Sequence, residues 1–283
     1  MKIGFIGAGK VGCTLGLYFR QSGLAEIAGY YSRSLSSAQE AAGLTDSRAF
    51  SSTSELIKKC DSIFITAPDG EIRNVYESIR GAALSGKTLC HCSGAMTAAE
   101  AFPGIAEYGA SACSVHPLFP VSDKYTAYKR LGDAMFCLEG DSAAVELWQG
   151  VLGSMGLRTR QIPGEAKSRY HAACAVMSNL VCALAAESTE LLAECGFTDE
   201  EARMALRPLA EYNLSGILSR SAAEALTGPV ERCDVPTVKK HLECIPEGTD
   251  RELYRYASLK LVELASQKHP ERDYSGMEEL LKN

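Results

Sequence analysis

A glycine-rich turn at the N-terminus constrains the fold of this chain more than any other stretch. Residues 2–6 read as a short strand, and Gly7-Ala8-Gly9-Lys10-Val11-Gly12 follows at once, before a helical pattern over 11–20. In this spacing the first glycine permits a tight turn, the second lets a pyrophosphate approach the backbone, and the third allows close helix–strand packing. Free N–H groups at the helix start then bind phosphate. The stretch predicts a dinucleotide-binding turn.

The end of the next predicted strand, 25–31, indicates which dinucleotide binds. It is followed by Ser32-Arg33-Ser34, about 20 residues beyond the turn, where an acidic residue would bond the ribose 2′-hydroxyl. No acid stands there. Arg33 can instead pair with a 2′-phosphate, and the two serines can donate hydrogen bonds to it. A solvated arginine at a strand end is the alternative, but within a nucleotide-binding fold the segment favours NADP over NAD.

Strand and helix patterns alternate through the first part of the chain. Further strands are expected at 48–50, 62–67, 87–91, 134–138 and 157–162, with helices at 36–42, 54–59, 71–83 and 142–155. This alternation of strands and helices predicts right-handed crossovers and a mainly parallel, doubly wound α/β sheet. Ligands of such sheets bind beyond the carboxyl ends of the strands. The residues expected to line the nicotinamide side are Pro68, Asp69, Ser93, Gly94 and the turn at His116-Pro117, and Ala67 is expected to contact the cofactor as well.

The second part of the chain changes character after residue 163. No glycine or proline occurs from 165 to 195, which predicts one long, largely buried helix, and helices at 199–218, 235–243 and 251–266 follow. We therefore expect two domains, a Rossmann-type domain at 1–163 and an all-helical domain at 164–283. Because about 120 residues give little cover to so long a helix, we expect a homodimer that packs the helical domains together.

Composition and charge exclude several classes of protein. The net charge of −6 argues against a nucleic-acid partner, which requires a basic face. The longest apolar stretch, 172–186, falls short of the roughly 20 residues of a membrane span, and nothing resembling a signal peptide precedes the first strand. We expect a cytoplasmic protein without a membrane partner.

Eleven cysteines raise the question of disulfides or a metal. The count is odd, no CxxC occurs, and Cys13, Cys137, Cys174 and Cys182 fall within apolar patterns, so reduced buried thiols are expected. The cluster Cys90-His91-Cys92 lacks the spacing of a zinc site. The sequence predicts no metal.

Several polar side chains are candidates for chemistry. Lys167 and His171 stand four residues apart on one face of the long helix, where a desolvated lysine can hold a substrate and a histidine can exchange a proton. A solvated lysine and a buried structural histidine are the alternatives. His116 lies where a strand is expected to break, near Ser93. A turn between helices is predicted at Thr227-Gly228-Pro229. Its residues either contact the substrate or simply cap a helix.

These motifs together resemble a bacterial family that pairs a Rossmann-like NADP-binding oxidoreductase domain with a helical C-terminal domain of unknown function. The matching segments are GAGKVG, Cys92-Ser93-Gly94, Ser114 to Leu118, Lys167 with Tyr170-His171, Ser178-Asn179, and Leu226 to Val230 with Arg232. The last segment in the family continues Arg-Gly-Asp, whereas Cys233 replaces the glycine here.

The family falls within the β-hydroxyacid and 6-phosphogluconate dehydrogenase-like superfamily, and this wider resemblance implies site residues. In those enzymes a Ser-Gly strand end and a lysine early in the long helix, similar to Ser93-Gly94 and Lys167, form the site, and His171 stands where they carry asparagine. Ser93 with His116-Pro117 also resembles prephenate dehydrogenases, and the layout is similar to that of pyrroline-carboxylate and ketopantoate reductases.

The sequence thus predicts an NADP-dependent oxidoreductase acting on a small hydroxy acid, oxo acid or imine in a cleft between domains. Ser93, Lys167 and Asn179 would hold the substrate, and either His116 or His171 would shuttle the proton. Thr227, Gly228 and Pro229 would add substrate contacts. Two alternatives stay open: a non-catalytic NADP(H) sensor, and an enzyme whose redox partner is a deazaflavin.

Overall fold

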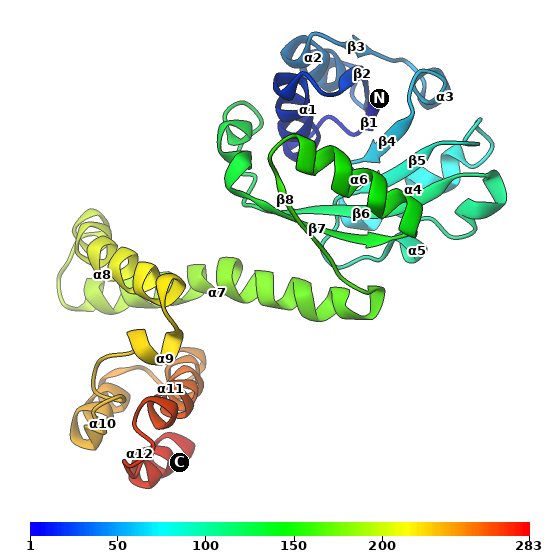
Figure 1. Ribbon diagram of the computed structural model, residues 1–283. Helices are drawn as coiled ribbons and strands as arrows, with labels where there is room; N and C mark the ends of the chain where they lie inside the picture. Colours follow the sequence, from blue (N-terminus) through cyan, green and yellow to red (C-terminus); the bar gives the residue numbers. More distant parts are fainter. The chain divides into compact units, whose positions relative to one another are not determined.

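The chain folds into two compact units. The computed structural model describes residues 1–283 (Figure 1). The two units are Met1–Ser178 and Asn179–Asn283. The division falls inside the long helix α7 (Lys167–Glu194), after the boundary expected at 163. The first unit is therefore described with the opening turns of α7, and the second unit by itself.

The first unit alternates strands and helices as the sequence predicts. Its strands are β1 (Lys2–Ile6), β2 (Glu26–Tyr31), β3 (Arg48–Ala49), β4 (Ser62–Ile65), β5 (Thr88–His91), β6 (Ser111–Leu118), β7 (Met135–Gly140) and β8 (Arg158–Gln161). Its helices before α7 are α1 (Lys10–Ser22), α2 (Leu35–Thr45), α3 (Thr53–Ile57), α4 (Asp69–Ile79), α5 (Ala98–Ala101) and α6 (Ser142–Ser154), with 3₁₀ turns η1 (Ile105–Tyr108), η2 (Ala127–Asp133) and η3 (Gly164–Ala166).

All eight strands join one sheet in the order β3-β2-β1-β4-β5-β6-β7-β8. Every pair is parallel except β6 with β7, so the predicted mainly parallel, doubly wound fold is confirmed. The side chains of α1, α2 and α6 pack on one face and those of α3, α4 and α5 on the other. The central strands β4 and β5 are buried along their whole length, as expected for parallel strands covered on both faces.

The path of β6 differs from the expected one. His116 was predicted at the break of a strand, but β6 continues through His116 and Pro117 to Leu118. The pairing with β5 ends at Ser114, whereas the antiparallel pairing with β7 goes on to Leu118. Pro117 therefore lies beyond the stretch that pairs with β5, where its missing N–H is tolerated. His116 projects from a strand held on one side by β7.

The second unit contains no strand, which confirms the predicted all-helical character. After α7 it comprises α8 (Asp199–Ser219), α9 (Ala222–Ala225), α10 (Val235–Cys244), α11 (Thr249–Lys268) and α12 (Ser275–Lys282). Its small core gathers around Val238, Val262 and Met277. The sequence reading missed the short helices α9 and α12.

The long helix α7 has the predicted extent but not the predicted burial. Lys167 is its one buried residue, and Val176, Leu180 and Leu184 are each about half exposed. The expectation of a largely buried helix was wrong for the single chain, because too few residues are present to cover it. Within residues 164–194, an 18-residue window has a mean hydropathy of 1.4, so this helix is long and apolar enough to cross a membrane. A helix of a soluble protein can meet the same criteria. Cys182, expected to be buried, is exposed on this helix.

The loop before α10 contains Cys233, the position at which the family resemblance implies a glycine. Cys233 adopts φ +59°, in the left-handed region that glycine enters without strain. Its thiol donates to the carbonyl oxygen of Asp273 at 3.4 Å. The turn is therefore one that favours glycine, formed here by a cysteine whose thiol bonds the Asp273 carbonyl.

Candidate functional site

The glycine turn has the geometry that a dinucleotide requires. A Cβ added at Gly12 would lie 2.7 Å from both the carbonyl oxygen of Gly7 and Oγ1 of Thr66, so the third glycine is needed for close packing. Thr66 Oγ1 also donates to the Gly7 carbonyl at 3.0 Å and ties the turn to the end of β4. A Cβ at Gly9 would meet no atom within 4 Å. The backbone of Gly9 is thus open to a ligand.

A cavity of about 540 Å³ opens over this turn. It extends from the ends of β1 and β4 to the end of β2, at the point where the sheet order reverses between β1 and β4. Such switch points are the usual nucleotide sites of doubly wound folds. The cavity is lined by Ile6, Gly7, Ala8, Gly9, Tyr31, Ser32, Arg33, Thr53, Thr66, Ala67, Pro68, Glu71, Asn74, Val75 and Ser78.

Most of the predicted cofactor contacts line this cavity. Gly7, Ala8, Gly9, Ser32, Arg33, Ala67 and Pro68 belong to its wall, whereas Lys10, Val11, Gly12, Ser34, Ser93 and Gly94 do not. The hydroxyl of Ser34 accepts a hydrogen bond from the backbone N–H of Ser37 and so caps α2. The sequence reading missed the wall residues from α3 and α4, because only the crossovers bring those helices to the turn.

The structure brings four predicted catalytic residues together in the first unit. Lys167 is buried, and its ammonium donates to the carbonyl oxygen of Ser93 at 3.0 Å and to the hydroxyl of Ser114 at 2.5 Å. The Ser114 hydroxyl in turn donates to the same Ser93 carbonyl at 3.1 Å. These bonds use two of the three N–H donors of Lys167 and leave one for a further partner.

The hydroxyl of Ser93 is itself engaged. It donates to Oδ2 of Asp69, the first residue of α4, at 2.6 Å and accepts from the N–H of Met96 at 3.1 Å. Ser93 is buried, so its hydroxyl fixes the strand end against α4. The sequence predicted neither the bond from Ser93 to Asp69 nor the bond from Lys167 to Ser114, because the two residues of each bond are distant in sequence.

His116 and His171 converge on Gly94. A Cβ at Gly94 would lie 2.9 Å from Nε2 of His116 and 2.5 Å from Cδ2 of His171, and the two rings lie 6.3 Å apart. Only glycine leaves room for both rings at this strand end. The other nitrogen of His116, Nδ1, lies 2.6 Å from the hydroxyl of Tyr170.

Burial sets the protonation of this cluster. It lowers the pKa of His116 to about 4, with nearby Lys167 adding to the effect, so His116 is neutral near pH 7. Burial also lowers the pKa of Lys167, which the nearby Glu139 carboxylate opposes. The pKa of Glu139 is raised by its own burial, against a hydrogen bond from the N–H of Ala98. A lysine with a lowered pKa can lose its proton more readily than one in water.

His91 lies beneath the site and is fully buried. Its Nδ1 accepts a hydrogen bond from the N–H of Ser93 at 3.1 Å. Burial lowers the pKa of His91 to about 3, so the ring stays neutral and keeps this bond. It supports the segment that carries Ser93 and Gly94.

The other predicted substrate contacts belong to the second unit. Asn179 is its first residue, and Thr227, Gly228 and Pro229 follow α9. Thr227 lines an open cavity of about 480 Å³ with Pro208, Leu209, Tyr212 and other residues of α8. The roles of these four residues stay predictions.

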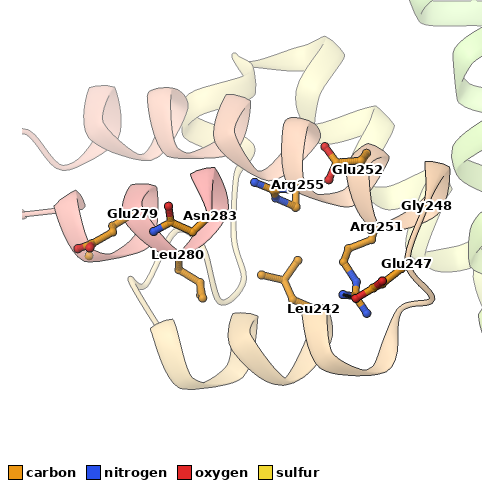
Figure 2. A pocket seen from close by; sticks show the side chains of 10 residues that line it. Leu242, Glu247, Gly248, Arg251, Glu252, Arg255, Glu279, Leu280 and Asn283 are labelled. Atoms are coloured by element: carbon orange, nitrogen blue, oxygen red, sulfur yellow. Dashed lines mark hydrogen bonds and ion pairs between the residues drawn. The ribbon is translucent and has the colours of Figure 1, made fainter.

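A larger cavity of about 760 Å³ lies among α10, α11 and α12 (Figure 2). Its two arginines serve the helix ends: Arg251 donates to the carbonyl oxygen of Ile245 after α10, and Arg255 donates to that of Leu281 in α12. Glu247 and Glu252 pair with the same guanidinium groups. The charges of this cavity are thereby used in holding the three helices together.

Family models match both parts of the chain. Residues 2–93 match the family "NADP oxidoreductase coenzyme F420-dependent", and residues 134–261 match "Domain of unknown function (DUF2520)". No protein of curated function matches the sequence.

Solved structures share the fold over nearly the whole chain. A protein from Thermotoga maritima is 26% identical, with a TM-score of 0.74 over 94% of this chain and 99% of that one. A candidate NADP oxidoreductase from Bacteroides fragilis is 18% identical, with a TM-score of 0.70 over 93% and 98%. A pyrroline carboxylate reductase from Plasmodium falciparum with NADP bound is 15% identical, with a TM-score of 0.56 over 95% and 96%. The chain thus joins a segment that matches the F420-dependent NADP oxidoreductase family to a helical segment that matches the DUF2520 family, in an architecture that the solved structures share.

Proposed function

We propose that this protein is an NADP-dependent oxidoreductase that reduces or oxidises a small substrate of the hydroxy acid, oxo acid or imine type. The observation that carries the proposal is the cavity over the glycine turn, which joins the open backbone at Gly9 to Arg33 at one end and to Pro68 at the other. When bound there, NADP supplies or accepts a hydride. The match of residues 2–93 to a family of NADP oxidoreductases supports the same chemistry.

Residues in the wall of this cavity and next to it can bind each part of the cofactor. The N–H groups that open α1 can bind the pyrophosphate, because the N-cap Gly9 makes no side-chain cap and leaves them free. Arg33 is exposed at the end of β2 and can pair with the 2′-phosphate. Pro68 and Asp69 stand at the end of β4, where the nicotinamide side is expected.

In the proposed reaction the cluster around Lys167 handles the proton. The free N–H donor of Lys167 can bond the substrate's oxygen or nitrogen and give up its proton as that atom is reduced. Neutral His116 can donate a hydrogen bond to the same atom. His171, at the site's exposed side, and Asn179 are proposed as substrate contacts.

A titration of the purified protein with NADPH and NADH, followed by nicotinamide fluorescence, tests the proposal first. We expect selective binding of NADPH and turnover with at least one member of a panel of oxo acids, hydroxy acids and cyclic imines. Absence of NADPH binding would contradict the proposal. Binding without turnover across the panel would favour the alternative of a non-catalytic NADP(H) sensor.

A deazaflavin as redox partner is the second candidate, because the family matched by residues 2–93 is described as coenzyme F420-dependent. Mixing the protein with NADPH and oxidised F420 separates the two functions. Loss of the F420 absorbance at catalytic protein concentrations supports the deazaflavin reaction. Unchanged absorbance, with turnover of an organic substrate, supports the first candidate.

Two glycine variants separate cofactor binding from folding. Gly9→Ala adds a methyl group into open space, so we expect unchanged thermal stability and weaker NADPH binding because the pyrophosphate loses its approach. Gly12→Ala forces a methyl group against Gly7 and Thr66, and we expect it to lose about 1–3 kcal/mol of stability. Thermal melts and NADPH titrations of both variants check this. Wild-type affinity in Gly9→Ala would place the pyrophosphate elsewhere.

We also propose that two copies of the chain associate through α7 and α8. The support is their exposed apolar side chains, including Leu180 at 54%, Leu209 at 68% and Leu218 at 74% exposure, since surfaces of this kind mark association sites. Sedimentation equilibrium should give twice the chain mass of 30.4 kDa. Leu180→Glu should halve that mass, whereas Leu24→Glu, at an equally exposed leucine of the first unit, should not. A monomeric wild-type protein would contradict the dimer.

A further inference from the structure

The hydrogen bond between Tyr170 and His116 gives Tyr170 a role that no motif assigned to it. Tyr170 lies on α7, three residues after Lys167, and its hydroxyl oxygen is 2.6 Å from Nδ1 of His116 on β6. The two rings meet edge to face, with centroids 5.6 Å apart and planes at 89°. The contact therefore fixes both the direction and the rotation of the imidazole.

Chemistry decides which group donates in this bond. Burial raises the pKa of Tyr170 above its usual value, so the phenol keeps its proton at neutral pH. The other groups within reach of the hydroxyl are the thiols of Cys137 and Cys174, which are weaker acceptors than a ring nitrogen. Donation of the phenol O–H to Nδ1 therefore satisfies the strongest acceptor within reach of the hydroxyl, and a neutral imidazole can accept at that nitrogen.

The opposite nitrogen of His116 then carries the hydrogen. Nε2 is the ring atom that faces Gly94, at the strand end where Ser93 and Lys167 meet. A neutral ring whose Nδ1 accepts must be an N–H donor at Nε2. His116 would accordingly polarise a substrate oxygen or nitrogen by a hydrogen bond, and Lys167 would be the group that transfers the proton.

We propose that Tyr170 is a positioning residue that holds His116 in the Nε2–H tautomer and so presents it to the substrate as a hydrogen-bond donor. The tautomer is a property of the protein alone. The donation to substrate rests on the proposed function.

The neighbours of His116 differ in whether they bond its Nδ1. Its charged and titratable neighbours are Lys167, Tyr170 and His171 from α7, Asp69 from α4, and His91 from β5. Asp69 is bonded by the Ser93 hydroxyl, and the Nδ1 of His91 is bonded by the Ser93 N–H. Tyr170 is the one neighbour with a hydrogen bond to Nδ1 of His116.

Nitrogen NMR of the full-length protein labelled with ¹⁵N-histidine tests the tautomer without cofactor or substrate. The His116 signals are assigned by their loss in His116→Asn. At pH 7 we expect a protonated Nε2 and an unprotonated Nδ1 in the wild type, and a mixture of tautomers in Tyr170→Phe. An Nδ1–H tautomer in the wild type overturns the proposal, and this measurement needs no variant at Tyr170.

Tyr76→Phe is the matched control. It also removes one phenol hydroxyl from the first unit, breaking a 3.0 Å bond to the carbonyl oxygen of Pro103, and it has no contact with His116. We expect wild-type His116 signals in Tyr76→Phe. Equal shifts in both variants would mean a general loosening of the unit and would overturn a specific role for Tyr170.

Once a substrate is found, kinetics add an independent readout. Tyr170→Phe should lower kcat roughly tenfold, the kinetic equivalent of one hydrogen bond, with little change in KM for NADPH. A tautomer shift without any change in kcat would remove His116 from the reaction and overturn the donor role. Lack of turnover in the wild type itself would count against the proposed function and leave the tautomer result standing.

Discussion

Replacing Lys167 with methionine is expected to lower kcat by about 10²- to 10⁴-fold, the usual contribution of a positioned proton donor. Methionine approximates the length of the side chain but removes its charge and all three donors. The Ser93 carbonyl keeps its bond from Ser114, so the strand end retains a partner and NADPH binding should be unchanged. Single-turnover measurements with NADPH and substrate, at several NADPH concentrations, check both the loss of rate and the unchanged NADPH binding.

The control for this change is Lys129→Met, at an exposed lysine of η2, which should behave as the wild type. The pH profile gives a second check. Burial lowers the pKa of Lys167 below the ordinary 10.5. Reduction needs the protonated form, so activity should fall as pH rises through this lowered pKa. Wild-type kcat in Lys167→Met would show that the lysine serves the fold alone.

Replacing Arg33 with aspartate is expected to weaken NADPH binding by about 100-fold, equivalent to about 2.7 kcal/mol. The variant removes a cation that can pair with the 2′-phosphate and places an anion beside it. NADH lacks that phosphate and should be affected far less. Titrations with the two nucleotides under one buffer and salt concentration give the comparison.

Arg130→Asp provides the same charge change at an exposed arginine outside the cavity, and should leave both affinities unaltered. An equal loss of NADPH and NADH binding in Arg33→Asp would mean a damaged turn. An unaffected NADPH affinity would remove Arg33 from the phosphate site.

The sequence predicted the fold well where local patterns carry the information. The glycine turn, the alternation of strands and helices and the long helix after residue 163 follow from spacing and composition, and the structure confirms the resulting class and nearly all the long elements. Short helices such as α5 and α9 were not predicted, because four residues are too few to show a helical period in the sequence.

Burial and partner choice were decided only by the tertiary structure. The pattern of α7 is that of a buried helix, yet the chain leaves it exposed, because burial depends on what lies opposite and not on the helix's own residues. The end of β6 was misplaced for a similar reason. The strand extends through His116 because it pairs with β7, and no local sequence pattern predicts that pairing.

For the site, the sequence by itself determined which residue types are present and which strand ends and helix turns carry them. Lys167, His116, Ser93 and the glycines were found this way. Only the tertiary structure decided what each group bonds, because Tyr170, Ser114 and Asp69 reach their partners across 54, 53 and 24 residues of chain. Hydrogen bonds of this range depend on folded geometry at the scale of 3 Å, which local spacing cannot specify.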